Sequence, residues 1–173
     1  MRHKSVSHLV HWSLDPSEPV VPVRQCEIRR LDSGDLQGVR RVERACFRDP
    51  WGRAWLEGLL ADCRIGTLVA VLDGKVAGYV VYHFRRRHLE LLSLAVHPRA
   101  RLRGIGTGLV AAVLRTLDGE RTAVVAYVWE RAAVATRFFA SCGFVASGTA
   151  GQPGRGFYRF VFRRGWPLPG EPC

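Results

Sequence analysis

The sequence predicts one α/β domain built around a single mixed sheet. Segments with strand-like and helix-like apolar periodicity alternate along the chain. Two β-branched runs flank Asp73 and Gly74, a strong signal for a two-residue hairpin turn. No linker divides the 173 residues, and this length suits one domain with a core of its own. These observations favour a sheet of about seven strands flanked by about four helices.

The first half of the chain is expected to supply a strand, two helices and the hairpin. Residues 26–31 alternate in polarity, as a half-buried strand does. Asp32 or Ser33 can cap the helix that follows, where apolar side chains recur on one face. Asp49 and Pro50 predict a turn before a short second helix. These elements are expected at 26–31, 32–47, 48–60 and, for the hairpin, 66–84.

The second half is expected to continue with a central strand, two helices and three more strands. Residues 88–96 are apolar enough for a strand buried on both faces. A helical pattern runs from about Gly104 to Leu117. Gly143 is expected to end the last helix, since glycine commonly follows a helix C-terminus. The remaining strands are expected at 122–130, 144–150 and 157–163, and the last helix at 132–142.

Both ends of the chain are expected to lie outside the domain, which spans residues 25–163. Residues 1–24 lack periodicity and predict a flexible tail, while residues 164–173 contain too much Pro and Gly for regular structure. The N-terminal stretch has no apolar segment of the signal-peptide type. No apolar run reaches the roughly 18 residues that cross a bilayer. The expected location is the cytoplasm, with no membrane partner.

The chain is strongly basic, with 26 Lys and Arg residues against 15 Asp and Glu and a formal charge of +11. Such a charge attracts polyanions, among them nucleic acid, the ribosome surface and phosphate-rich cofactors. A base composition that favours arginine codons produces the same excess. Nucleic-acid contact through the basic surface is therefore allowed but is not predicted as the function.

Cysteine usage argues against a metal site. The chain has 5 cysteines, an odd number, and no two have the C-x-x-C spacing of zinc ligands. No metal is therefore expected.

A glycine-rich turn lies between the predicted strand 88–96 and the helix that follows it. Arg101, Gly104 and Gly106 match the pattern R/Q-x-x-G-x-G/A. The first N–H groups of a helix lack internal partners, and the helix dipole is positive there, so a diphosphate can accept their hydrogen bonds. Glycine lets the backbone approach such a ligand closely. The same residues would also make a plain tight turn, and the flanking strand and helix favour the ligand.

Two other phosphate-binding patterns fail at this turn. A G-x-G-x-x-G fingerprint counted from Gly104 needs a third glycine where Leu109 stands. A P-loop needs a lysine, and none is near.

The motif carries a resemblance to a known family. The stretch LLSLAVHPRARLRGIGTGLV resembles the acyl-CoA-binding motif of the GCN5-related N-acetyltransferases (GNAT), and AYVWERAAVATRFFASCGF resembles the family's next block. The resemblance covers roughly residues 25–163 and implies the GNAT fold. VERACFRDPWGRAWLEGLL also looks like a stretch of the bacterial ribosomal-protein-alanine (RimI-like) branch. That stretch supplies Glu43, Phe47, Pro50, Trp51 and Leu56, although simple packing between two short helices explains its aromatic residues as well.

The resemblance implies acetyl-CoA as co-substrate and direct acyl transfer within a ternary complex. Backbone groups near Val96 would pair with the pantetheine arm, and the Val96 N–H would face the developing oxyanion. The glycine turn would hold the diphosphate. The cofactor-binding residues implied are Leu94, Ala95, Val96, Arg101, Leu102, Arg103, Gly104, Ile105, Gly106, Thr107, Ala132 and Phe139.

The chain departs from the RimI-like pattern at three positions. Tyr127 stands where a carboxylate is expected, Ala132 where an asparagine is expected, and Phe139 where a tyrosine is expected. Phenylalanine cannot donate a proton to the departing thiolate, which is a tolerable leaving group without a dedicated acid. The candidate catalytic residues are Tyr127, Glu90 and Glu130, and we expect the base to act through water.

The function predicted is acetylation of a primary amine, with a protein N-terminal α-amine as the leading acceptor and a ribosomal protein as one candidate. An α-amine has a pKa near 8 and a lysine side chain one near 10.4, so weak base machinery fits the former better. The alternatives are a non-catalytic acyl-CoA-binding or ribosome-associated module and a small-molecule amine acetyltransferase. The sequence leaves the acceptor and the oligomeric state open.

Overall fold

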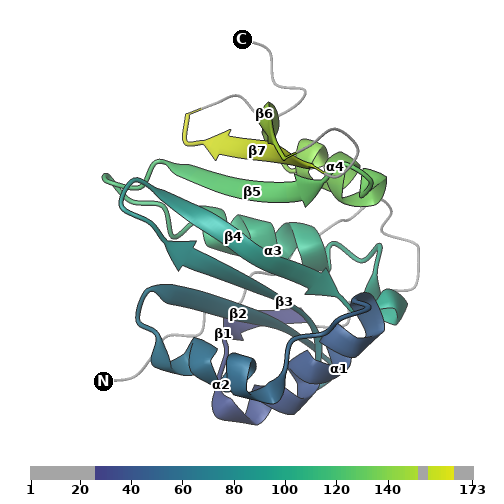
Figure 1. Ribbon diagram of the computed structural model, residues 1–173. Coiled ribbons are helices and arrows are strands. Elements are labelled where there is room, and N and C mark those ends of the chain that lie inside the picture. Colours follow the sequence, from purple (N-terminus) through teal and green to yellow (C-terminus); the bar gives the residue numbers. More distant parts are fainter. Residues whose placement is uncertain (1–25, 152–155, 166–173) are drawn as a thin grey trace, which may run out of the picture.

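The structure, a computed structural model, describes residues 26–151 and 156–165. The predicted tail at 1–24, most of the predicted tail at 164–173 and the centre of the loop at 151–156 lie outside the described residues. Within those residues, seven strands and four α-helices follow one another in the predicted order, which confirms the expected α/β fold (Figure 1).

The element boundaries agree closely with those expected from the sequence. The strands are β1 Cys26–Arg30, β2 Ile65–Leu72, β3 Lys75–Phe84, β4 His88–Val96, β5 Ala123–Trp129, β6 Val145–Ala150 and β7 Phe157–Arg163. The α-helices are α1 Leu36–Cys46, α2 Arg53–Ala61, α3 Ile105–Leu114 and α4 Ala133–Ser141. Two short 3-10 turns, η1 Ser33–Asp35 and η2 Pro98–Ala100, precede α1 and α3.

Local hydrogen bonds shape the turn before α1 and the end of α3. Asp32 caps the 3-10 turn η1 that leads into α1, because its side chain accepts the Gly34 N–H at 2.8 Å and the Asp35 side chain accepts the Asp32 N–H at 3.0 Å. The helix predicted to reach Leu117 ends at Leu114 instead. The Thr116 hydroxyl donates to the Val113 carbonyl at 2.7 Å, and this bond competes with a further helical turn.

One mixed sheet organises the domain, with strand order β1-β2-β3-β4-β5-β7-β6. Among the described strands, β4 and β5 form the one parallel pair, and every other neighbour is antiparallel. The hairpin between β2 and β3 turns at Asp73 and Gly74, whose φ angles are 51° and 73°. Two consecutive positive φ angles fit the type I′ turn that the sequence predicts there.

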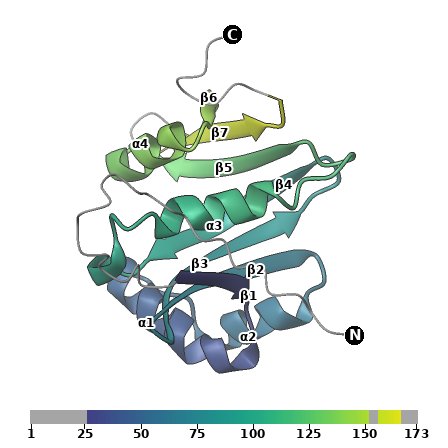
Figure 2. The same cartoon turned by 180° about the vertical axis from the view of Figure 1, so that it is seen from behind.

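The helices lie on both faces of the sheet and define two cores. The larger core lies between the sheet and α3 with α4, and Figure 2 shows α3 lying across the middle of the sheet on that side. The smaller core lies under α1 and α2, against β2, β3 and β4. On this second face, no described helix lies over β5 and β7 (Figure 1). Half of the sheet is therefore left without a described helix on this face.

Close packing of α1 on β3 depends on Gly38. A Cβ at Gly38 would lie 2.7 Å from Cγ2 of Val76 and 2.8 Å from its Cβ, which is closer than real Cβ contacts come. Gly58, inside α2, has open space around the same position within the described residues. Alanine substitutions at these two helical glycines therefore distinguish the effect of close packing from that of helix propensity.

We predict that Gly38→Ala lowers the free energy of unfolding by about 1–3 kcal/mol, because the added methyl overpacks the α1–β3 contact. The matched variant Gly58→Ala is expected to raise it by about 0.5–1 kcal/mol, because alanine favours helix where nothing obstructs it. Urea titrations of both variants measure the two effects. Equal stabilisation by both would contradict the close contact at Gly38.

Candidate active site

Strands β4 and β5 part at one end of the sheet. Their pairing runs from His88 with Ala123 to Leu91 with Ala126, although β4 continues to Val96. Each strand keeps its pairing with its outer neighbour beyond this point, β4 with β3 and β5 with β7. The result is a gap in the middle of the sheet, referred to below as the β4–β5 gap.

A bulge in β4 lies where this gap begins. Val81 of β3 pairs with Ser93, and the next residue, Tyr82, pairs with Leu91. Leu92 is therefore the extra residue in β4. A bulge bends its strand and increases the local twist, which accounts for β4 turning away from β5 after Leu91.

The backbone of β4 presents alternate residues to the gap. The His97 N–H donates to the Ala77 carbonyl at 2.8 Å, so His97 faces β3. Because backbone groups alternate along a strand, those of Val96 and Leu94 face the gap. The Ala95 carbonyl faces β3, since a Cβ at Gly78 would lie 2.9 Å from it. Of the three β4 residues implied for pantetheine binding, only Leu94 and Val96 therefore present their backbone groups to the gap.

The Val96 carbonyl already has partners in this structure. Arg101 donates its Nε–H to that oxygen at 3.1 Å, and the Cys46 thiol donates to it at 3.3 Å. The Arg101 guanidinium also reaches the Cys46 sulfur at 3.7 Å. The end of α1 and the glycine turn thus meet at the end of β4. Cys46 carried no signal in the sequence that singled it out from the other cysteines.

The glycine turn presents bare backbone at the start of α3. Leu102 and Gly104 have φ angles of 61° and 74°, and the Leu102 side chain is fully exposed. Within the part of the chain that the structure describes, the N–H groups of residues 103–107 have no hydrogen-bond acceptor. These donors lie at the positive end of the α3 dipole, so their chemistry fits the diphosphate of an acyl-CoA.

The two expected cofactor contacts on the last helix lie in different surroundings. Ala132 is the N-cap of α4 and is half-buried against the larger core. Phe139 is buried in that core, with its ring centroid 5.2 Å from that of Phe144 and 6.2 Å from that of Phe160. At the position of the family's tyrosine, the chain therefore places a packed aromatic ring.

The three candidate catalytic side chains are not gathered at one point. Tyr127 directly follows Ala126, the last β5 residue that pairs with β4. Its side chain is exposed on the face opposite α3. Glu90 lies in the paired part of β4, and its carboxylate is held by Arg85 at 2.6 Å. Glu130 follows the end of β5, where its N–H donates to the Gly156 carbonyl at 3.1 Å. Only Tyr127 lies where the gap opens.

A buried carboxylate fixes the segment between α1 and α2 onto the sheet. Glu43 is 2% exposed, and it accepts hydrogen bonds from the Tyr79 hydroxyl and, at 2.9 Å, from the Trp51 N–H. The Tyr79 hydroxyl lies 3.0 Å from the Ser93 hydroxyl, beside the β4 bulge. Burial and the hydrogen bond to Glu43 raise the pKa of Tyr79 above its usual range. The family-like stretch pointed to Glu43, but its partner Tyr79, and Ser93 beyond Tyr79, lie too far away in the sequence to be predicted.

Aromatic pairs flank this face of the sheet at two places. Trp51 and Trp55 have ring centroids 3.6 Å apart at the start of α2, and Trp129 and Phe157 have centroids 3.8 Å apart at the ends of β5 and β7. Trp55 and Trp129 are exposed. The apolar faces of these rings are available to an acceptor that approaches the uncovered half of the sheet.

Among the described residues, no group of three or more His, Cys, Asp or Glu side chains could hold a metal ion. No helix among them is long and apolar enough to cross a membrane.

Comparisons with known proteins agree with this geometry. The chain matches the acetyltransferase (GNAT) family over residues 36–144. An uncharacterized N-acetyltransferase of Methanocaldococcus jannaschii is 34% identical over 91 residues, which cover 53% of this chain and 56% of that protein. The match thus spans little more than half the length of that relative.

Solved structures share the fold at low identity. The ribosomal-protein-S18-alanine N-acetyltransferase of Escherichia coli superposes with a TM-score of 0.71 at 18% identity, over 86% of this chain and 99% of that one. NAA60 of Arabidopsis thaliana in complex with acetyl-CoA gives 0.68 at 19% identity, over 80% and 98% of the two chains. With the family match extending over more than half of its length, this chain belongs to the GNAT acetyltransferase family.

Proposed function

We propose that the protein is an acetyl-CoA-dependent N-acetyltransferase whose acceptor is the α-amine of a protein or peptide N-terminus. The observation that carries the proposal is the β4–β5 gap with the N–H donors of residues 103–107 at its end. A strand edge without a partner and a cluster of unpaired N–H groups together match an extended amide-bearing arm that ends in a diphosphate. Family membership supplies the reaction class.

Binding of acetyl-CoA is expected to use backbone groups at both ends of this site. The N–H groups of residues 103–107 hold the diphosphate, and the Leu94 and Val96 backbone groups pair with the pantetheine arm along the gap. The Val96 carbonyl must then exchange its bonds from Arg101 and Cys46 for those of the arm. The freed Arg101 guanidinium lies close enough to the turn to add a charged contact to the phosphates.

The acceptor amine is expected to arrive from the opposite face, because α3 and α4 cover the other one. Tyr127 and the aromatic pair Trp129 and Phe157 line this uncovered face. The neutral amine attacks the thioester carbonyl, and the amide bond forms as the carbon–sulfur bond breaks. The amine proton passes to water, and CoA leaves as its thiolate, which takes up a proton from the solvent to give the free thiol. Tyr127 orients that water, and the Val96 N–H stabilises negative charge on the carbonyl oxygen.

An α-amine suits this site better than a lysine side chain. Its pKa near 8 leaves a useful neutral fraction at physiological pH, whereas a lysine amine near 10.4 needs a strong base. Tyr127 alone lies at the gap among the candidate groups, and Glu90 is engaged by Arg85. The Escherichia coli neighbour is named for an alanine of a ribosomal protein, which agrees with a protein N-terminus as acceptor. The cytoplasmic location is part of this proposal and rests on the sequence.

The first of three predictions for this site concerns the reaction itself. We expect acetyl-CoA to be consumed, with release of free thiol, when peptides with a free small N-terminal residue are supplied. The same peptides with a formylated N-terminus, and polyamines as small-molecule acceptors, should release no thiol above background. A thiol-detection assay with mass spectrometry of the peptides measures this. Tight CoA binding without turnover on any acceptor would favour a non-catalytic acyl-CoA-binding module.

The second prediction concerns the glycine turn. Gly104 and Gly74 have nearly equal φ angles of 74° and 73°, and a Cβ at either meets no described atom within 4 Å. Alanine at either position therefore adds the same backbone strain, of about 1–2 kcal/mol. Only Gly104→Ala should weaken CoA binding, by about tenfold, because it shifts the N–H donors of the turn. Calorimetric titration of both variants measures this, and equal affinities would remove the turn from the CoA site.

The third prediction concerns Tyr127. Tyr127→Phe should lower kcat by about 10- to 100-fold without changing the Kd for acetyl-CoA, because a water relay contributes less than a direct base. Glu90→Gln should keep kcat near that of the parent, since Arg85 already engages its carboxylate. For the parent, kcat/KM should rise with pH towards the amine pKa near 8, because only the neutral amine attacks. A pH–rate profile of Tyr127→Phe that overlays the parent would exclude Tyr127 from proton transfer.

A further inference from the structure

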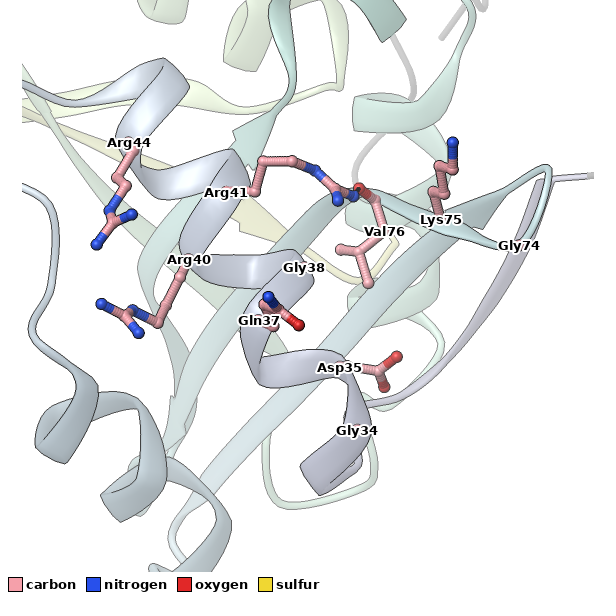
Figure 3. A pocket seen from close by; sticks show the side chains of 10 residues that line it. All are labelled: Gly34, Asp35, Gln37, Gly38, Arg40, Arg41, Arg44, Gly74, Lys75 and Val76. Carbon is pink, nitrogen blue, oxygen red and sulfur yellow. Dashed lines mark hydrogen bonds between the residues drawn. The ribbon is translucent and has the colours of Figure 1, made fainter.

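A basic groove lies on α1, apart from the residues assigned to acetyl transfer. Its volume is about 520 Å³, and it runs along η1 and α1, beside the turn between β2 and β3 (Figure 3). The residues that line it are Gly34, Asp35, Gln37, Gly38, Arg40, Arg41, Arg44, Gly74, Lys75 and Val76. We refer to it as the α1 groove.

Four cationic side chains surround the α1 groove, and no described carboxylate neutralises them. None of Arg40, Arg41, Arg44 and Lys75 forms an ion pair within the described part of the chain. Arg41 donates instead to the Val76 carbonyl, at 3.3 Å. The lining of the groove therefore holds four cations against one carboxylate.

The one carboxylate in the lining is already engaged. Asp35 is almost buried and accepts two hydrogen bonds from the Arg29 guanidinium, at 2.6 and 2.8 Å. Burial alone would raise the pKa of Asp35, but the bonds from Arg29 and from the Asp32 N–H hold it below its usual value. The carboxylate stays ionised and paired with Arg29, so it does not neutralise the groove. The acid within α1, Glu43, is buried against the sheet.

The placement of the four cations indicates the shape of their ligand. Arg40 and Arg44, one helical turn apart, extend from one flank of α1, whereas Arg41 extends from the other flank towards Val76, on the side of Lys75 (Figure 3). A compact anion could contact one flank only. An extended polyanion that crosses the helix could contact both.

The chemistry of the lining narrows the ligand further. No aromatic side chain lines the groove, so nothing there can stack on a base. Three of the lining residues, Gly34, Gly38 and Gly74, are glycines without side chains. Cations without stacking partners contact phosphates and leave base identity unread.

We propose that the α1 groove binds the phosphate backbone of RNA without reading its sequence. The net charge of +11 attracts the polyanion over longer range, and the cations on the two flanks of α1 hold successive phosphates. This activity is separate from acetyl transfer. It stands or falls independently of the proposed function, because none of the four side chains is assigned to the β4–β5 gap or the glycine turn.

The test compares two triple variants of the full chain that lose the same charge. The groove variant is Arg40→Gln/Arg44→Gln/Lys75→Gln, and the control variant is Arg30→Gln/Arg86→Gln/Arg115→Gln, whose three side chains are exposed elsewhere on the surface. Fluorescence anisotropy with labelled single-stranded RNA of mixed sequence, repeated over a range of KCl, gives the affinity and its salt dependence. A circular-dichroism melt and CoA titration of each variant verify that the fold and the glycine turn are intact.

We expect the groove variant to bind RNA at least about tenfold more weakly than the parent. The slope of log K against log salt should fall by about 2, because each phosphate contact on a single strand contributes about 0.7. The control variant should keep most of the parent's slope. Equal losses in both variants would show attraction by net charge alone and would overturn the proposal. Polyglutamate that displaces the RNA at equal charge would assign the groove to an acidic protein and overturn it as well.

Discussion

The loss of pairing between β4 and β5 beyond Leu91 and Ala126 is the constraint on which the rest of the site depends. Backbone N–H and C=O groups in the middle of a sheet are costly to leave without partners. The sheet tolerates the gap because β3 and β7 hold the outer edges of the two strands to their ends. At the inner edge, Arg101 and Cys46 donate hydrogen bonds to the Val96 carbonyl. The amide groups of an acyl-CoA arm would pair with the backbone groups of Leu94 and Val96 instead.

The surrounding elements follow from that gap. The chain leaves β4 through η2 and the glycine turn and enters α3 directly, so the dipole of α3 and its first N–H groups lie at the open end of the gap. On the opposite face, Glu43 ties Trp51 and Tyr79 together and thereby fixes the segment between α1 and α2 beside the bulge. One side of the site thus consists of the N–H donors at the start of α3. On the other side, buried Glu43 fixes the segment between α1 and α2.

Much of the fold was predictable because its signals are local. Apolar periodicity placed the strands and helices, Asp73 and Gly74 placed the hairpin turn, and the glycine pattern placed the start of α3. The predicted end of α3 lies three residues too far along the chain, because a local i→i−3 hydrogen bond from the Thr116 N–H to the Val113 carbonyl, which the Thr116 hydroxyl shares, replaces the helical pattern. Such a bond leaves no trace in the hydrophobic pattern.

The site was predictable only in part, because its remaining features depend on contacts between distant segments. Nothing in β4 or β5 alone indicates where their pairing stops, or that Leu94 and Val96 face the gap while Ala95 faces β3. The contact of Cys46 with Val96 joins residues 50 positions apart. Likewise, the surroundings of Phe139 could not be predicted from its neighbours in the sequence, and the structure places this residue in the larger core.

Amide hydrogen exchange, followed residue by residue by NMR with and without saturating CoA, tests the central claim most directly. We expect CoA to slow exchange at residues 103–107 and at Leu94 and Val96, whose N–H groups acquire partners, and to leave Ala95, already bonded to β3, unchanged. Unchanged exchange at residues 103–107 and along the gap would contradict the account, whichever other residues responded.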